Sequence, residues 1–320
     1  MIVRSLVDDN LPDGWRIETT SVLSRDGDNI GILHPATLHE IVGDEISAIL
    51  GPAGRVALTE GTNYIEALSA CGALLLGHRE EISKVSTLLQ SARMSRTTSY
   101  LCSISGNCRQ VLTAVRHIQT ARVAVVGCGG IGSLAAMLLA GSGIRSLTLV
   151  DNDTIEESNL NRQIVWSKDD IGQLKSDVLA RELQRRFDDV SLALYPRRAD
   201  RSFLQLLLSE NDAVLLTADS PLGIVPAARR IAARLCSLLV TGGYSFKHAI
   251  VTVTNSQSNS AGKEGNWQSL EFCIPPSFGP ANALLAGATT SALLHQLCEL
   301  ADYGASSIFG WDVDTLKNSA

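Results

Sequence analysis

The sequence predicts an α/β fold built on a doubly wound, mostly parallel sheet. The first observation is a run of valine and alanine at 123–126 that leads into a glycine-rich turn and then a helical segment. The second is the alternation, from there to residue 243, of short apolar segments with amphipathic ones. Strands that alternate with helices in this way are typical of parallel sheets. The apolar segments at 249–254 and 308–314 predict antiparallel strands at the C-terminal end of the domain.

The composition indicates a globular protein and excludes several functional classes. The 320 residues are 45% hydrophobic and 19% charged, which is enough chain for one large and one small domain. The formal net charge of -6 argues against a general nucleic-acid binder. The seven cysteines include no C-x-x-C pair, so we expect no zinc site. The first residues are unlike a signal peptide and no long uncharged apolar stretch is present, so we expect a cytoplasmic protein without a membrane span.

Residues 1–92 form a candidate module of their own, which we describe as a winged-helix-like α+β module. Two predicted strands flank a turn of charged and polar residues near residue 27. We expect strands at 15–23 and 29–33 and helices at 37–50, 63–76 and 81–92. A peptide-binding role and an ordinary packing or dimerisation role fit this module equally well.

A connector and then the main domain follow the module. Residues 93–120 are predicted to be a connector and a helix: an exposed connector at 93–110, with Arg93, Arg96 and Arg109, and then a helix at 110–119. Residues 121–320 form the predicted nucleotide-binding domain. Its helices are expected at 133–140, 172–183, 202–208, 224–236 and 281–300, and its strands at 123–126, 147–150, 190–195, 213–219, 238–243, 249–254 and 308–314.

The glycine-rich turn predicts a nucleotide site. The turn contains Gly127, Gly129, Gly130 and Gly132, and these glycines allow bare backbone amides to approach a ligand at the start of a helix. The partial positive charge of a helix N-terminus favours a phosphate there, so the arrangement is Rossmann-like. Asp151 ends the next predicted strand, 22 residues after Gly129, where a carboxylate accepts ribose hydroxyls.

A second group of polar residues distinguishes triphosphate cleavage from coenzyme binding. Breaking a triphosphate requires cations on the departing phosphates and a carboxylate for magnesium. Arg162 and Lys175 suit the first task, and Asp219, at the end of a predicted strand, suits the second. Individually, the two cations are also compatible with a solvated surface pair and Asp219 with a helix N-cap. We therefore interpret the three together as a catalytic set.

Five separated motifs resemble, in the same order, those of the ThiF/MoeB superfamily of adenylating enzymes, which are related to ubiquitin activators. The motifs are GCGGIG at 127–132, DND at 151–153, SNLNRQ at 158–163, GQLK at 172–175 and TAD at 217–219. The resemblance implies an enzyme that uses ATP and Mg²⁺ to activate a carboxylate. It implies that Asp151 and Asp153 belong to the nucleotide site, that Asn159, Arg162, Gln163 and Lys175 bind the phosphates, and that Asp219 is the magnesium ligand.

Within that superfamily the chain is most similar to the peptide-modifying branch, which includes the enzymes of pantocin A and microcin C7 biosynthesis. The similarity extends to SGI at 142–144, KDDIG at 168–172 and FGPAN at 278–282. It implies a ribosomally made precursor peptide as substrate, with residues 1–92 as the clamp for its leader, and cyclisation of an activated side-chain or C-terminal carboxylate. It also implies a homodimer in which an arginine of the partner completes the site, for which Arg96 is the candidate.

Three other readings stay open at this point. The glycine turn and Asp151 are equally compatible with a NAD-dependent oxidoreductase. The superfamily also contains activators of ubiquitin-like and sulfur-carrier proteins. A peptide-binding scaffold that keeps a nucleotide for structure is the non-catalytic alternative. The sequence does not decide whether AMP or ADP would leave.

Overall fold

The computed structural model describes residues 15–17, 22–33, 38–42, 45–51, 53–59, 61–245, 248–256, 277–300 and 307–312. The chain divides into two compact units, Met1–Arg116 and His117–Ala320. The helix α5 (Cys108–Thr120) contains the boundary between them. Each unit is described by itself below.

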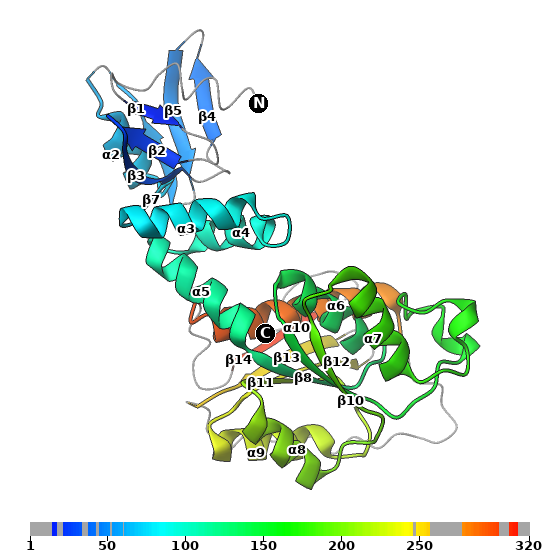
Figure 1. Cartoon of the computed structure of the whole chain (residues 1–320). Coiled ribbons are helices and arrows are strands. Elements are labelled where there is room, and N and C mark those ends of the chain that lie inside the picture. The colour runs from blue at the N-terminus through cyan, green and yellow to red at the C-terminus, as the bar shows by residue number, and fades with distance from the viewer. Residues whose placement is uncertain are drawn as a thin grey trace. The chain divides into compact units, whose positions relative to one another are not determined.

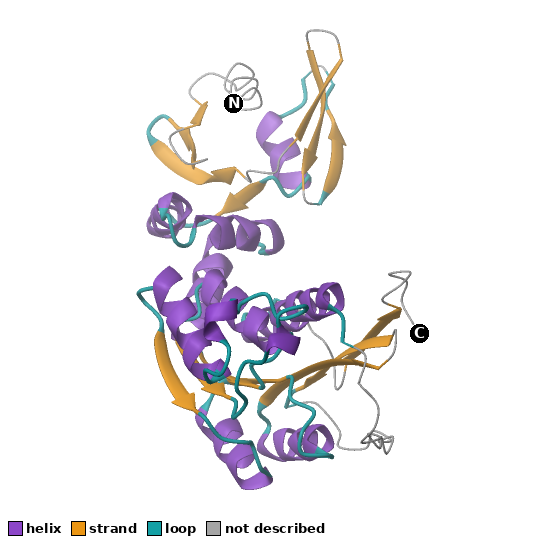
Figure 2. Ribbon diagram, turned by 90° about the vertical axis from the view of Figure 1, so that its right-hand side faces the viewer, coloured by secondary structure: helices purple, strands orange, loops and turns teal. Residues whose placement is uncertain are grey.

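In its described residues, the first unit combines two small antiparallel sheets with three helices and the first part of α5 (Figures 1 and 2). One sheet has the order β1-β2-β3-β7 and the other the order β4-β5-β6. Its core gathers leucine, isoleucine and alanine side chains from β2, β3, β5 and α2. The strands are β1 (Trp15–Ile17), β2 (Val22–Arg25), β3 (Asp28–Leu33), β4 (Leu38–Val42), β5 (Glu45–Gly51), β6 (Gly54–Ala57) and β7 (Leu74–Leu76), and the helices are α2 (Tyr64–Ala70), α3 (Arg79–Gln90) and α4 (Ser95–Ile104).

Four sequence-based expectations for this unit are wrong. The single strand expected at 15–23 is the two antiparallel strands β1 and β2, in which Ile17 pairs with Leu23. The helix expected at 37–50 is the antiparallel pair β4 and β5, in which Ile41 pairs with Ile46. The β-branched isoleucines favour a strand over a helix, and the sequence Gly43-Asp44 between them is typical of a turn. The end of the helix expected at 63–76 is the strand β7, and the connector expected at 93–110 contains the helix α4, which buries Leu101.

The second unit is a seven-stranded sheet with the order β10-β9-β8-β11-β12-β13-β14. The first five strands in that order are parallel, and β13 and β14 are antiparallel, so the predicted fold class is confirmed. The strands are β8 (Arg122–Val126), β9 (Ser146–Val150), β10 (Ser191–Tyr195), β11 (Ala213–Leu216), β12 (Leu238–Ser245), β13 (His248–Thr254) and β14 (Ser307–Asp312). The chain runs outward from β8 to β10 and then returns to β11 on the other side of β8. The point between β8 and β11 is therefore where a ligand is expected, at the carboxyl ends of the strands.

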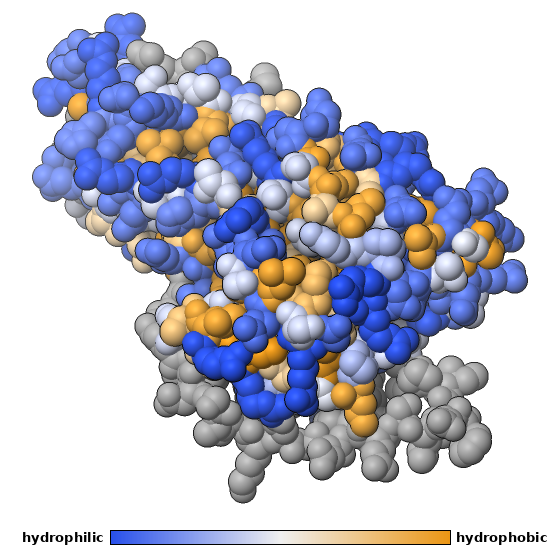
Figure 3. Space-filling model, turned by 60° about the horizontal axis from the view of Figure 1, so that its bottom comes forward, coloured by the Kyte–Doolittle hydropathy of each residue, from blue (hydrophilic) through white to orange (hydrophobic). Residues whose placement is uncertain are grey.

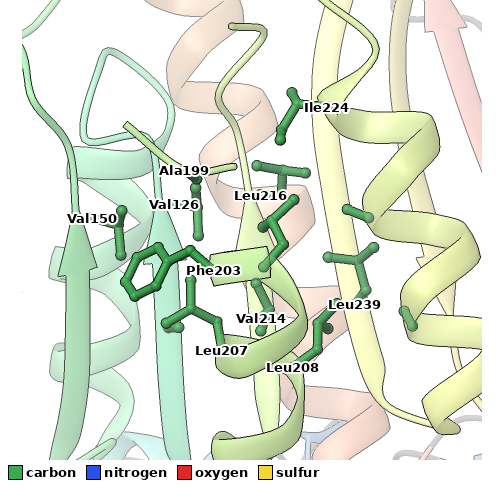
Figure 4. Close-up of a cluster of buried hydrophobic side chains, with 14 residues drawn as sticks. Val126, Val150, Ala199, Phe203, Leu207, Leu208, Val214, Leu216, Ile224 and Leu239 are labelled. Atoms are coloured by element: carbon green, nitrogen blue, oxygen red, sulfur yellow. The ribbon is translucent and has the colours of Figure 1, made fainter. Parts of the chain in front are cut away.

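Helices cover both faces of this sheet. Figure 1 shows α6, α7 and α10 on one face and α8 and α9 on the other. Their bounds are α6 (Gly132–Ser142), α7 (Lys175–Arg186), α8 (Arg201–Glu210), α9 (Ile224–Leu235) and α10 (Gly279–Leu297). The layer between the sheet and the helices α8 and α9 is an apolar core, which Figure 4 shows. Its labelled side chains are Val126, Val150, Ala199, Phe203, Leu207, Leu208, Val214, Leu216, Ile224 and Leu239.

The surface is mixed in character. Figure 3 shows hydrophobic side chains as patches separated by hydrophilic ones on the visible face. Among the helices that the structure describes, none combines the length and the apolar character that crossing a bilayer requires.

Candidate nucleotide-binding site

The glycine turn between β8 and α6 is tightly folded. Gly127 has φ +90°, and its N–H donates to the carbonyl of Val150 at 2.9 Å. A Cβ at Gly132 would overlap the carbonyl oxygen of Gly127 and lie 2.6 Å from the Thr217 hydroxyl. Only glycine fits these two positions, because one needs a positive φ and the other has no space for a side chain. The chain thus turns back on itself and presents the amides at the start of α6.

The end of β11 lies directly against this turn. The Thr217 hydroxyl donates to the carbonyl of Gly127 at 2.9 Å, and the N–H of Thr217 donates to the carbonyl of Val126. A Cβ at Gly127 would lie 2.7 Å from the backbone nitrogen of Ala218. Asp219 follows at once, so its backbone lies within about 8 Å of the turn, because consecutive Cα atoms are about 3.8 Å apart.

The Asp219 carboxylate has no assigned partner in the described parts of the chain. The residue is exposed, and no described group forms a hydrogen bond or ion pair with it. No group of three or more His, Cys, Asp or Glu side chains placed to hold a metal ion occurs among the described residues. A single free carboxylate next to a phosphate site is nonetheless the arrangement for a Mg²⁺ that takes its other ligands from phosphate oxygens and water.

Asp151 closes the other side of the turn. One carboxylate oxygen accepts the N–H of Cys128 at 2.6 Å, and the other accepts the N–H of Asp153 at 2.7 Å. Burial raises the pKa of the Asp151 carboxyl above its ordinary value of 3.8, against the opposing effect of these two backbone donors and of Lys175. Each carboxylate oxygen has two acceptor positions. Asp151 therefore keeps the capacity to accept ribose hydroxyls.

Lys175 lies beside this carboxylate and forms an ion pair with Asp153. Its ammonium is 3.0 Å from an oxygen of Asp153, and its side chain is only 8% exposed, against 56% for Asp153. Backbone bonds support the pair, because the N–H of Lys175 donates to the carbonyl of Asp153 and the N–H of Ile155 donates to that of Gln173. The start of α7 is thereby attached to the chain that leaves β9. A buried cation consequently stands next to the nucleotide turn.

The loop between these paired segments carries Asn159, Arg162 and Gln163. The buried Asn159 side chain accepts the N–H of Glu156 at 3.2 Å, which caps the short 3-10 helix Glu157–Asn159. The guanidinium of Arg162 donates to the carbonyl of Ser158 at 2.6 Å. The carbonyl of Arg162 lies 3.5 Å from the position that a Cβ on Gly130 would take. The loop therefore lies against the glycine turn.

Two side-chain amides face adjacent glycines of the turn. The Nε2 of Gln163 is 4.0 Å from the position of a Cβ on Gly129, and the Nδ2 of Asn282 occupies the position that a Cβ on Gly130 would need. Asn282 is 3% exposed and donates to the carbonyl of Arg162 at 3.5 Å. It comes from the first turn of α10. Our sequence reasoning assigned no role to Asn282, although the FGPAN motif that contains it was available as a signal.

The structure brings most of the predicted site residues together at one edge of the sheet. The glycines 127, 129, 130 and 132, Asp151, Asp153, Asn159, Arg162, Gln163 and Lys175, and the segment that carries Asp219, belong to one contiguous arrangement. Arg96 is exposed on α4, which belongs to the first unit. Cations and amide donors around a bare-amide turn suit a polyphosphate.

Comparison with known proteins agrees with this geometry. The model of the ThiF family matches residues 109–314. The sulfur carrier protein ThiS adenylyltransferase of Escherichia coli is 35% identical over 109 residues, which are 34% of this chain and 43% of that protein. The chain spans less than half the length of the curated relatives it matches.

Two solved structures share the fold. E. coli MccB, crystallised with ATP, superposes with a TM-score of 0.66 at 22% identity, over 90% of this chain and 95% of MccB. MccB has also been solved in complex with N-formylated MccA. PaaA superposes with a TM-score of 0.63 at 17% identity, over 88% of this chain and 97% of PaaA.

Proposed function

This chain belongs to the ThiF family, and from that premise we propose that it uses ATP and Mg²⁺ to activate a carboxylate of a ribosomally made precursor peptide. The observation that carries the proposal is the set of charged residues that surrounds the glycine turn. A dinucleotide site needs backbone amides and a ribose carboxylate, and Asp151 with the turn supplies both. The additional buried Lys175, the guanidinium of Arg162 and the exposed Asp219, for which the described residues provide no partner, are what departing phosphates and a metal ion require.

The proposed chemistry begins with nucleotide binding. The amides at the start of α6 and the side chains of Lys175 and Arg162 hold the triphosphate, and Asp151 accepts the ribose hydroxyls. Asp219 is the proposed ligand of Mg²⁺, which would neutralise phosphate charge when bound. These groups place the α-phosphorus in line with a substrate carboxylate, so proximity and charge stabilisation supply most of the rate enhancement.

The proposed group transfer has two balanced steps. A carboxylate oxygen forms a bond to the α-phosphorus as the bond to pyrophosphate breaks, which yields an acyl-adenylate. An internal amide nitrogen or carbanion of the peptide then attacks the acyl carbon, AMP leaves with the former carboxylate oxygen, and one proton is released. The net result is a cyclised, dehydrated peptide. In-line attack at the γ-phosphorus is the alternative and would release ADP and then phosphate.

A peptide substrate, with a glutamate side chain as the group activated, is the finer part of the proposal. It is supported by the likeness of fold to MccB, which has been solved with the peptide MccA, and by the likeness to PaaA. We propose residues 1–92 as the leader clamp, 93–120 as a connector and helix, and 121–320 as the adenylating domain. Strand addition at a sheet edge is the binding mode that small β-rich modules offer to an extended leader.

We also propose that two copies of the chain form a homodimer. The helices α6 and α10 pack together, and Leu138 and Leu284 on them are 44% and 40% exposed. Exposed leucines on adjacent apolar helices favour a protein interface over solvent. Arg96 of the partner is the proposed additional cation of the site, acting on the phosphates of the other copy.

Activation of a sulfur-carrier or ubiquitin-like protein is the second candidate. It is favoured by the 35% identity to the ThiS adenylyltransferase over 109 residues. The two candidate functions differ in the binding partner that they require. A sulfur-carrier activator forms a complex with a folded protein through its C-terminus, whereas a peptide-modifying enzyme binds an unstructured leader.

The test is nucleotide release with candidate substrates. The protein is mixed with ATP, Mg²⁺ and either precursor peptides or a folded sulfur-carrier protein, and AMP, pyrophosphate, ADP and phosphate are quantified. We expect peptide-dependent release by the wild type and by Lys168→Ala, an exposed lysine of the same loop, but not by Arg162→Ala. Absence of release with every carboxylate substrate, together with tight binding of NAD, would refute the proposal.

A further inference from the structure

Trp166 forms a buried hydrogen bond with one of the predicted phosphate-binding residues. Its indole N–H donates to the Oε1 of Gln163 at 2.7 Å, and each residue is 6% exposed. Trp166 itself lies outside the sequence motifs that indicated the ligand-binding residues. The indole nitrogen is the only polar atom of this side chain and carries a single hydrogen, so its one hydrogen bond is the one to Gln163.

This bond determines which end of the Gln163 amide faces the nucleotide turn. An indole nitrogen donates and cannot accept, so its partner must be the amide oxygen and not the amide nitrogen. The NH₂ group of Gln163 is consequently directed to the other side, where its Nε2 lies 4.0 Å from the position of a Cβ on Gly129. An NH₂ group has two donors and attracts an anion, whereas an amide oxygen in that place would repel it.

We propose that Trp166 is a positioning residue for nucleotide binding: it locks the Gln163 carboxamide with its donor end toward the phosphates. The inference rests on the proposed function, since it needs a phosphate beside Gly129. Without the indole donor, the two amide orientations differ little in energy and the oxygen faces the phosphate part of the time. The affinity for a ligand without phosphates, such as adenosine, would not depend on the orientation of this amide.

The experiment is a double-mutant cycle on nucleotide affinity. The dissociation constants of ATP and of adenosine are measured by titration calorimetry for the wild type, Trp166→Phe, Gln163→Ala and the double variant. We expect Gln163→Ala to weaken ATP binding about tenfold, as for loss of a hydrogen bond to a charged group. Trp166→Phe is expected to weaken it roughly threefold to tenfold, and the double variant no more than Gln163→Ala alone. Adenosine binding stays within about twofold throughout.

The outcomes separate this inference from the proposed function. Wild-type protein that binds no ATP overturns both. ATP binding that is unchanged in Trp166→Phe, or effects of the two substitutions that simply add, overturns the inference alone. Equal loss of ATP and adenosine binding in Trp166→Phe also overturns it, because that pattern indicates a general packing defect.

A second measurement avoids dependence on the folding of Trp166→Phe. The protein contains four tryptophans, so ¹⁵N-labelled indoles give a spectrum that can be assigned. We expect the Trp166 indole signal of the wild type to keep its hydrogen-bonded shift when ATP is added and to move upfield in Gln163→Ala. An indole signal at the same position in wild type and Gln163→Ala overturns the inference.

Discussion

Replacement of Lys175 by methionine separates the nucleotide role of this cation from its structural role. The ammonium is 3.0 Å from Asp153, but the two partners differ in exposure, at 8% for Lys175 and 56% for Asp153. Methionine keeps the apolar stem and leaves an exposed carboxylate, which water solvates. Because a pair with one exposed partner contributes about 1 kcal/mol or less, we expect little loss of stability.

The reverse substitution is expected to destabilise the fold more. Asp153→Asn removes the counterion and leaves a buried ammonium without its charge partner, which costs about 1–3 kcal/mol. For ATP affinity we expect the opposite order, with a larger loss in Lys175→Met than in Asp153→Asn. Lys175→Met loses a charge-assisted bond to phosphate, worth about 1.5–3 kcal/mol, or roughly 10- to 150-fold in ATP affinity.

Two assays on the same preparations check this reasoning. Urea denaturation gives the relative stabilities, and calorimetric titration with ATP gives the affinities. Lys168→Met is the control, because Lys168 is an exposed lysine of the segment that precedes α7. Wild-type ATP affinity in Lys175→Met would show that the cation does not contact phosphate. Lower stability of Lys175→Met than of Asp153→Asn would show that the burial argument is wrong.

Three further predictions concern the turn and its carboxylates. Gly132→Ala should abolish ATP binding, because its Cβ would overlap the Gly127 carbonyl, whereas the control Gly141→Ala, whose Cβ has 3.7 Å to its nearest neighbour, should bind normally; equal affinities would contradict the role of the tight turn. Asp219→Asn should lose Mg²⁺-dependent turnover without a change in melting temperature, since the carboxylate is exposed and unpaired within the described chain; a lowered melting temperature would indicate a structural role instead. Burial raises the folded-state pKa of Asp151 above 3.8, so this group lowers wild-type stability as pH rises from 3.8 through the raised pKa. The stability of Asp151→Asn relative to wild type should therefore increase over that range in denaturation curves, and a decrease would mean that the backbone donors outweigh burial.

Local patterns in the sequence were sufficient for the sheet and the centre of the site. Strands β8 to β12 are short apolar runs bounded by polar residues, and each lies where the alternation of segments predicts. The glycine turn and Asp151 were identifiable because their function depends on neighbours in the chain: a strand end, a tight turn and a helix start. Parallel order then brought the ends of β8, β9 and β11 to one edge.

Contacts between distant segments required the tertiary structure. The segment 37–50 has apolar residues at a spacing that suits a helix, and only pairing of β4 with β5 made it a hairpin. Asn282 lies 152 positions after Gly130 along the chain, and although the FGPAN motif contains it, that motif does not indicate which residue its amide covers. The orientation of Gln163 likewise depends on a single indole hydrogen bond. The reason is physical: periodicity and turn propensity act over a few residues, whereas packing and hydrogen bonding across the core are decided only when remote elements come together.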